Sequence, residues 1–154
     1  MDTIMANILA LSDDEDICDV IQIVLERACH DTVIAVSNLA QAAAAAQQHR
    51  PDLIVLEFVA RMDDLAIGIP VYQRIRKLEW LHEVPVLFWM VPNPTRIYPQ
   101  AQQLGVAGCI AMPSQPEELV EARDVILSGG TYYPPLPPAS QNAHEDAGLE
   151  PKKS

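Results

Sequence analysis

The sequence predicts an α/β protein with a doubly wound parallel sheet of five strands and helices on both faces. Two observations lead to this prediction. Short apolar runs alternate with longer segments of helical character five times between residues 8 and 127, which is the pattern of repeated strand–helix units. Two of the runs, residues 53–56 and 85–90, contain no charged side chain, as expected for central strands covered on both sides. Crossovers between such strands are right-handed.

The first unit runs from an apolar strand at residues 8–11 into an amphipathic helix. Apolar residues recur at three- and four-residue spacing from Ile17 to Ala28, which places them on one face of a helix. Acidic residues stand at the start of this helix, where negative charge favours the positive end of the helix dipole. The segment therefore predicts a strand, an acidic turn and a helix.

The second unit begins with residues 32–36, which are rich in β-branched side chains and predict a strand. Asn38 is a good N-cap for the helix that follows. That helix runs through the alanine block at 42–46 to about His49, because alanine has the strongest helix propensity.

The third unit is centred on the apolar residues 53–56, which follow a turn at Pro51. Residues 59–69 predict a loop. Pro70 suits the first turn of a helix, and this helix is expected to continue to about Leu78.

The fourth unit starts with the buried strand at residues 85–90 and continues into a segment that is crowded with proline. A helix is expected over residues 95–104. Pro99 within it lacks an N–H and clashes with the preceding turn, so we expect it to kink or shorten that helix.

The fifth unit contains a short strand at residues 107–111. Ser114 and Glu117 have the spacing of a capping box, which predicts a helix from there to about Leu127. The glycines at 129–130 are expected to end it.

In sheets of this kind the functional crevice lies beyond the carboxyl ends of the strands. Four segments of the sequence are expected there. They are residues 12–14, 57–64, 90–94 and 112–114.

One domain is expected over residues 1–133. Residues 134–154 are rich in proline and poor in large apolar side chains, which is typical of disordered chain. We interpret them as a disordered tail, or as a linker to a downstream domain that is missing.

The charge of the chain limits its partners. It has 10 Lys and Arg residues against 21 Asp and Glu, for a net charge of −11. This balance repels phosphate backbones and argues against direct nucleic-acid binding, whereas it suits docking on a basic protein. No apolar run is long enough to span a membrane, and the N-terminal segment carries an acid where a signal peptide carries positive charge. A cytoplasmic protein is expected.

Cysteine and histidine form no metal motif. Cys18, Cys29 and Cys109 are too far apart for a CxxC pair or a zinc site, and the four histidines are equally scattered. We expect the three cysteines to be buried, reduced thiols.

Five segments, each following a predicted strand or helix in the expected order, carry a resemblance to a known family. They are ILALSDDEDI, PDLIVLEFVARMDD, VPVLFWMVP, LGVAGCIAMPSQPEEL and ILSGGTYYPP. Over about residues 6–133 the chain resembles the receiver domain of bacterial two-component response regulators. The resemblance implies a flavodoxin-like sheet with strand order 2-1-3-4-5 and a signalling module that is not an enzyme. The GGTYYP ending is similar to regulators that continue into a helix-turn-helix output domain.

The resemblance places the family's phosphorylation chemistry on altered residues. Two acids after the first strand help to bind Mg²⁺ in the family, and they fall here on Ser12 and Asp13. The aspartate that accepts the phosphoryl group falls on Glu57. Serine is a poor ligand for Mg²⁺ compared with a carboxylate, and the longer glutamate moves its oxygen away from the geometry of in-line attack.

The groups that bind the phosphoryl oxygens in the family are also altered. The Ser/Thr position falls on Met90 and the lysine on Met112, while the proline that follows persists as Pro113. The switch aromatic falls on Cys109. A thioether neither neutralises phosphate nor donates a hydrogen bond. The resemblance therefore implies a receiver with a degenerate phosphorylation site.

Two interpretations of Glu57 remain open. Its carboxylate could mimic a phosphorylated aspartate, or it could be a relic in a site without chemical demand. We favour the relic, because the Ser/Thr and lysine that would sense a mimic are absent. No cofactor is expected. Asp13 and Glu57 bind a cation such as Mg²⁺ weakly at best, since like charges so close otherwise raise one pKa.

Other residues receive structural interpretations. Met90 and Met112 are expected to form an apolar plug across the crevice, with a hydrophobic ligand pocket as the sharper alternative. Trp89 is expected in the core. Residues 132–133, both tyrosine, are expected to pack at the end of the last helix. The basic cluster of Arg74, Arg76, Lys77 and His82 is expected to be a solvated face.

The leading hypothesis for function is a phosphorylation-independent receiver that acts by protein–protein contact. Its expected partner surface combines the proline-interrupted segment at 92–104 with residues 107–127, the helix 4, strand 5 and helix 5 face of receivers. A homodimer is an open alternative for the assembly. The rival functions are a phosphorelay receiver that accepts phosphate, and a small-molecule sensor with an apolar pocket near Met90 and Met112.

Overall fold

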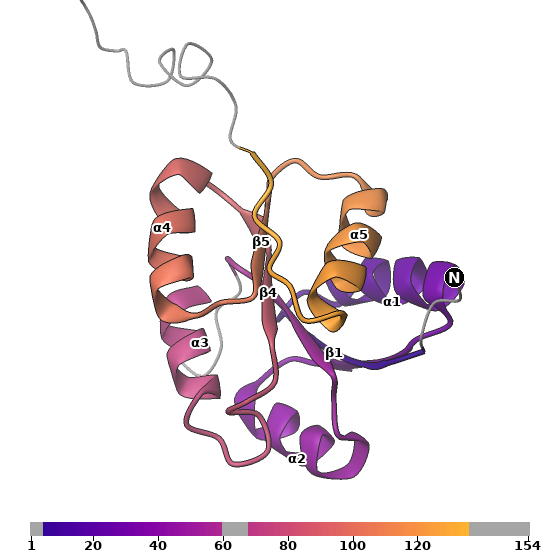
Figure 1. Ribbon diagram of the computed structural model, residues 1–154. Coiled ribbons are helices and arrows are strands. Elements are labelled where there is room, and N and C mark those ends of the chain that lie inside the picture. Colours follow the sequence, from indigo (N-terminus) through magenta and orange to yellow (C-terminus); the bar gives the residue numbers. More distant parts are fainter. Residues whose placement is uncertain (1–4, 60–67, 136–154) are drawn as a thin grey trace, which may run out of the picture.

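Five parallel strands form one sheet in the order β2-β1-β3-β4-β5 (Figure 1), which confirms the predicted fold class and strand order. The computed structural model describes residues 5–59 and 68–135. The strands are β1 (Asn7–Leu11), β2 (Thr32–Val36), β3 (Leu53–Glu57), β4 (Val86–Val91) and β5 (Gly108–Ala111). The helices are α1 (Glu15–Cys29), α2 (Leu39–His49), α3 (Gly68–Ile75), α4 (Pro94–Leu104) and α5 (Pro116–Leu127).

The helices cover the sheet on both faces. Helices α1 and α5 lie on one face, and α3 and α4 lie on the other (Figure 1). Strand residues alternate between the two resulting cores: Leu9 and Leu11 pack with α2, α3 and α4, whereas Ile8 and Ala10 pack with α1 and α5. Strand β3 is buried along its whole length, as its unbroken apolar run predicted.

Local signals set the starts of the first two helices. Asp14 caps α1, since its side chain accepts the backbone N–H of Asp16 at 2.9 Å. Asn38 caps α2 as predicted, by accepting the N–H of Gln41 at 2.8 Å. Both caps satisfy backbone donors that have no partner inside the helix.

Two predictions about helix length were wrong. Helix α3 ends at Ile75 and not near Leu78, because the chain then continues in turns. Helix α4 runs unshortened through Pro99. Pro94 at its first turn and Gly105 at its C-cap, with φ of 87°, set its two ends.

The capping box of the last helix lies one residue later than predicted. Helix α5 begins at Pro116, and the box joins Gln115 with Glu118, whose carboxylate accepts the Gln115 N–H at 3.2 Å. Proline suits the first helical position, so the cap falls on Gln115. Ser114 is thereby left outside the helix.

The chain after α5 covers the outer edge of β5. Tyr132 pairs with Gly108 in parallel, and its carbonyl accepts the Cys109 N–H at 2.9 Å. The Tyr132 hydroxyl donates to Glu121 of α5 at 3.1 Å, which agrees with the predicted packing on the last helix. Tyr133 turns to the other side, where its ring lies 5.6 Å from that of Tyr98.

The predicted solvated basic face was wrong for Arg76. Its guanidinium lies over the Tyr72 ring at 4.8 Å, and its Nη1 donates to the carbonyls of Leu81 and His82 at 3.0 and 2.8 Å. Arg76 therefore fastens the turns that follow α3.

The predicted loop at 59–69 lies largely outside the described residues, because 60–67 are not described, and its end was wrong, since residues 68 and 69 already belong to α3. The predicted tail also lies largely outside them, because 136–154 are not described. Among the residues that are described, no helix is long and apolar enough to cross a membrane.

Candidate functional site

The carboxyl ends of β1, β3, β4 and β5 meet at one edge of the sheet, where the sequence predicted the crevice. Strand β1 ends at Leu11 and is followed by Ser12, and strand β3 ends at Glu57 itself. The pairing of Leu11 with Leu56 brings these two side chains together. The expected acceptor position therefore lies directly beside the position of the expected acidic pair.

A short hydrogen bond joins Ser12 and Glu57. The Ser12 Oγ donates to Glu57 Oε1 at 2.6 Å and accepts the backbone N–H of Asp14 at 2.9 Å. Only 1% of Ser12 and 8% of Glu57 is exposed. A serine hydroxyl has one proton to donate, so Glu57 takes the whole donor capacity of Ser12.

Burial is the main cause that raises the pKa of the Glu57 carboxyl above its ordinary value. The hydrogen bond from Ser12 opposes this rise, and the negative charges of Asp13 and Asp14 add to it. The carboxyl at the acceptor position is therefore more easily protonated than an exposed glutamate.

Glu57→Gln is expected to change how stability depends on pH. Because the folded pKa of Glu57 is raised, the folded state loses stability relative to the unfolded chain as pH rises from about 4.3, the ordinary value for glutamate, through the raised value. The glutamine amide carries no such titration and can still accept the Ser12 hydroxyl. The variant should gain stability relative to wild type as pH rises, which urea unfolding at about pH 5 and pH 8 measures.

The exposed Glu79 supplies the control for this prediction. Glu79→Gln makes the same substitution at an exposed side chain and is measured at the same two pH values. If the stability difference between Glu57→Gln and wild type changes with pH no more than the difference for this control, the pKa of the Glu57 carboxyl is not raised.

The expected weak cation site at Asp13 and Glu57 gains no support from the geometry. Asp13 is exposed, and one Glu57 oxygen already accepts the Ser12 hydroxyl. Across residues 5–59 and 68–135, no group of three or more His, Cys, Asp or Glu side chains is arranged to hold a metal ion. Mg²⁺ often binds through one or two carboxylates and several waters, so a weak site at Asp13 and Glu57 stays a prediction.

Strand β4 is irregular at Met90. Its pairing with β5 shifts between Trp89 and Val91, and Met90 has φ of 66°, which residues other than glycine rarely adopt. Trp89 and Met90 both pack on the side of α1 and α5, whereas Val91 packs on the opposite side. The irregularity thus interrupts the alternation of a regular strand.

The predicted apolar plug was wrong for Met112. Met90 is half-buried, but Met112 exposes 46% of its surface. Met112 lies one residue beyond the end of β5, and its N–H donates to the Val91 carbonyl at 3.0 Å. The peptide bond to Pro113 that follows is cis. The two methionines therefore do not close the crevice together.

A contact that the sequence did not predict joins β4 to the loop before α5. Trp89 is buried, as predicted, and its indole N–H donates to Ser114 Oγ at 3.1 Å. The shift of the helix cap to Gln115 leaves this hydroxyl available.

The predicted buried thiols are confirmed: Cys18, Cys29 and Cys109 are buried and free. Burial raises the pKa of all three thiols, that of Cys109 to about 12. Thiols with such values carry little reactive thiolate. Cys109, at the position of the switch aromatic, therefore acts in packing.

Sequence reasoning missed a buried ion pair that joins the turn after α1 to helix α5. Arg123 Nε and Nη2 donate to the two Asp31 oxygens at 2.9 and 2.6 Å, and 2% and 4% of these residues is exposed. Asp31 also accepts the Ala6 N–H at 2.9 Å. The partners are 92 positions apart, and no local pattern signals such a pair.

The sequence is similar to a described family and to a curated relative. The family model of the response regulator receiver domain matches residues 8–124. A protein of Pseudomonas aeruginosa, provisionally described as a transcriptional regulator, is 26% identical over 131 residues. The match covers 84% of this chain and 60% of that protein, so this chain spans less than two thirds of its relative.

Solved structures share the fold. The isolated receiver domain of RcsB from Salmonella enterica serovar Typhimurium has a TM-score of 0.71 at 16% identity, over 85% of this chain and 94% of that one. A LuxR-family two-component response regulator from Aurantimonas sp. has a TM-score of 0.70 at 21% identity, over 96% and 100%. Chemotaxis protein CheY4 of Vibrio cholerae has a TM-score of 0.63 at 22% identity, over 77% and 95%.

At these identities the structures show the fold alone, whereas the family match rests on the sequence. That match spans well over half of the chain. This protein belongs to the response regulator receiver domain family of two-component signalling.

Proposed function

We propose that this protein is a cytoplasmic, non-enzymatic receiver that transmits a signal by protein–protein contact, without being phosphorylated. The observation that carries the proposal is the hydrogen bond of 2.6 Å between Ser12 and Glu57. An acceptor carboxylate must be free to attack phosphorus in line. Here one of its oxygens is bound to a buried neighbour, and burial raises its pKa.

The residues around Glu57 support the same proposal. Phosphoryl transfer depends on groups that position the phosphoryl and neutralise its charge. Met90 and Met112 stand where the family has a hydroxyl and an ammonium group, and neither thioether donates a hydrogen bond. Met90 also packs toward α1 and α5. These losses favour Glu57 as a relic and not as a mimic, since thioethers stand at the two positions that would sense its charge.

We assign the partner surface to α4, β5 and α5, the face used by receivers. On α4, Tyr98 and Ala101 face the core, and residues that include Thr95, Arg96 and Gln100 are exposed. A protein contact there suits a chain with a net charge of −11, which disfavours direct contact with nucleic acid. The Pseudomonas relative is longer than the shared segment, so DNA contact by that protein need not involve the shared part.

The two rival functions have less support. A phosphorelay receiver would need a free acceptor, whereas one Glu57 oxygen already accepts the Ser12 hydroxyl. A ligand pocket near Met90 and Met112 would need enclosure, but Met112 is exposed.

Incubation with acetyl phosphate and Mg²⁺, followed by intact-mass measurement, tests the proposal. Wild type is expected to gain no adduct of about 80 Da, the mass of one phosphoryl group. Glu57→Gln is the matched control, because its amide cannot form an acyl phosphate. An adduct on wild type that is absent from Glu57→Gln would establish phosphorylation at Glu57 and overturn the proposal.

A further inference from the structure

Residues 131–133, which we call the strap, lie along the outer edge of β5 like a short additional strand. The Tyr132 N–H donates to the Ala107 carbonyl at 2.9 Å, and the Tyr132 carbonyl accepts the Cys109 N–H at 2.9 Å. This pairing is parallel. Pro134 follows directly and has no N–H to donate. The backbone pairing of the strap is therefore centred on Tyr132.

The two tyrosines of the strap pack on opposite sides of β5. The Tyr132 side chain lies at the margin of the core under α1 and α5, and its hydroxyl donates to Glu121 at 3.1 Å. The Tyr133 ring meets Tyr98 of α4 edge-on, with the ring centres 5.6 Å apart, and its hydroxyl donates to the Val106 carbonyl at 2.6 Å. The strap therefore contacts α4, β5 and α5, the elements of the proposed partner surface.

Two exposed glycines join the strap to the end of α5. Gly129 has φ of 100°, and a Cβ placed on it would meet nothing within 4 Å. Glycine has wide freedom in φ and ψ, so rotation at Gly129 and Gly130 lets the strap leave the sheet while α5 stays intact. Segments with few buried contacts open at free energies below that of global unfolding.

The strap covers a site that fits an extended chain. The Cys109 thiol is fully buried and lies within hydrogen-bonding reach of the Tyr133 hydroxyl. When the strap leaves, the Cys109 N–H and the Ala107 carbonyl lose their partners, and the Tyr98 ring loses its neighbour. An unpaired strand edge is a template for another extended chain, and strand addition is a common mode of peptide recognition.

We infer that the strap is releasable and that the site it vacates binds an extended segment of a partner protein. This segment pairs with β5 in parallel and places an aromatic side chain against Tyr98. The strap itself shows the chemistry that the site accepts, and in its closed position it competes with the partner. The inference rests on the proposed function, because it names the kind of partner that the α4, β5 and α5 surface receives.

A helix would not replace the strap. A helix uses its backbone N–H and C=O groups within itself, so it cannot pair with the edge of β5. The Cys109 N–H, in a residue with no exposed surface, would then remain without its acceptor, and a buried donor of this kind costs free energy.

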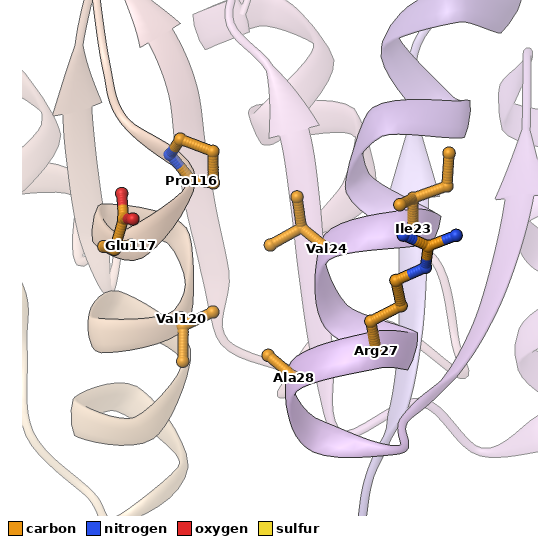
Figure 2. A pocket seen from close by; sticks show the side chains of 7 residues that line it. All are labelled: Ile23, Val24, Arg27, Ala28, Pro116, Glu117 and Val120. Carbon is orange, nitrogen blue, oxygen red and sulfur yellow. The ribbon is translucent and has the colours of Figure 1, made fainter.

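The acidic side of α5 adds charge to the site. Helix α5 turns Val120 toward α1, where it lines an apolar groove (Figure 2), whereas the neighbouring Glu121 meets the strap. Release of the strap frees the Glu121 carboxylate from the Tyr132 hydroxyl. Glu117 is also exposed, and the four-residue spacing places it on the same side of the helix. A lysine or arginine near the aromatic residue of the partner would find its counter-charge here.

Thiol labelling of the native full chain tests the release of the strap. Cys109 packs in the core that contains Tyr98, whereas Cys18 and Cys29 are buried in the other core and serve as internal controls. N-ethylmaleimide treatment, digestion and mass spectrometry give the labelling rate of each thiol. Cys109 should react roughly tenfold faster than Cys18 and Cys29, because opening of the strap exposes it without unfolding of the domain.

Tyr133→Ala removes the ring that holds the strap on α4. It should raise the labelling rate of Cys109 roughly threefold or more and leave the rates of Cys18 and Cys29 unchanged. Tyr133→Phe keeps the ring and loses one hydrogen bond, so its effect should be smaller. Circular dichroism checks that each variant is folded. Tyr133→Leu, which keeps more buried surface, takes the place of Tyr133→Ala if that variant does not fold.

A peptide with the sequence of residues 129–135, GGTYYPP, is the probe for the vacated site. At about 1 mM, the range of effective concentration for a short tethered segment, it should slow the labelling of Cys109 in Tyr133→Ala roughly twofold or more. The same peptide with alanine as its second aromatic residue should protect less, because it brings no ring to Tyr98. Wild type should be protected less than Tyr133→Ala, since its own strap occupies the site.

Equal labelling of the three thiols in wild type overturns the inference, because the strap then leaves only when the domain unfolds. A Cys109 rate that Tyr133→Ala does not change also overturns it, since a different opening then exposes the thiol. Equal protection by the two peptides, or protection by neither, rejects an extended aromatic partner at this site. An acyl phosphate on Glu57 would overturn the proposed function and leave these labelling rates as they are, so the two failures are distinguishable.

Discussion

Arg123→Met is expected to lower the free energy of unfolding by about 3–5 kcal/mol, the usual cost of removing one partner of a buried ion pair. Arg123 makes two hydrogen bonds to Asp31 and a third, of 2.7 Å, to Asp124. Methionine of similar length would fill much of the space. It would leave the Asp31 carboxylate buried beside the Ala6 N–H without its guanidinium, and a buried charge without its counter-ion is strongly destabilising.

Urea unfolding of the variant and of wild type measures this loss. Arg74→Met, the same substitution at an exposed position of α3, should change stability by less than about 0.5 kcal/mol. The double variant Asp31→Asn/Arg123→Met should lose less than the sum of the two single losses, because the second change removes a charge already without its partner. A loss for Arg123→Met that matches that of Arg74→Met would show that the pair contributes little.

The pair also sets the relative position of two helices. Asp31 lies in the turn between α1 and β2, and Arg123 lies on α5. Together they tie the turn after α1 to α5 through a contact that is closed to solvent.

The sequence predicted the fold well because its signals are local. Strand runs such as 53–56 need only their own composition, and the Asn38 cap needs only the next few residues. These signals combine into the strand order once the family resemblance is added. The errors in α3, α4 and the α5 capping box concern where helices end or begin, and several nearby residues compete for those positions.

The candidate site was predictable in position but not in geometry. The resemblance placed Ser12, Glu57 and Met112 at one edge of the sheet, and the strand ends bring the first two together. The hydrogen bond between Ser12 and Glu57 joins residues 45 positions apart, and the irregularity at Met90 is a backbone feature without a glycine to announce it. Both depend on tertiary packing, which overrides local preference.

Gly108→Ala is the second change with a large expected effect, because glycine at this position lets the chain after α5 lie against β5. A Cβ added at Gly108 would lie 2.8 Å from the Tyr132 carbonyl oxygen and 3.1 Å from Ile126 Cδ1. The carbonyl is held in place, since it accepts the Cys109 N–H at 2.9 Å. Either the strand edge or the 131–133 segment must move.

We expect Gly108→Ala to cost about 1–3 kcal/mol, as overpacking usually does, and to loosen the cover of the β5 edge. Urea unfolding measures the cost, and faster hydrogen exchange at the Cys109 and Tyr132 amides would report the loosening. Gly130→Ala is the comparison variant, because its Cβ would lie 3.1 Å from the Val125 side chain and 3.3 Å from the Val125 carbonyl oxygen, farther than the 2.8 Å from a carbonyl oxygen at Gly108. If the two variants lose equal free energy of unfolding, the closer approach at Gly108 adds no cost of its own. A selective loss at Gly108 would show that the close packing of residues 131–133 on β5 stabilises the protein and covers a strand edge that could otherwise pair with other chains.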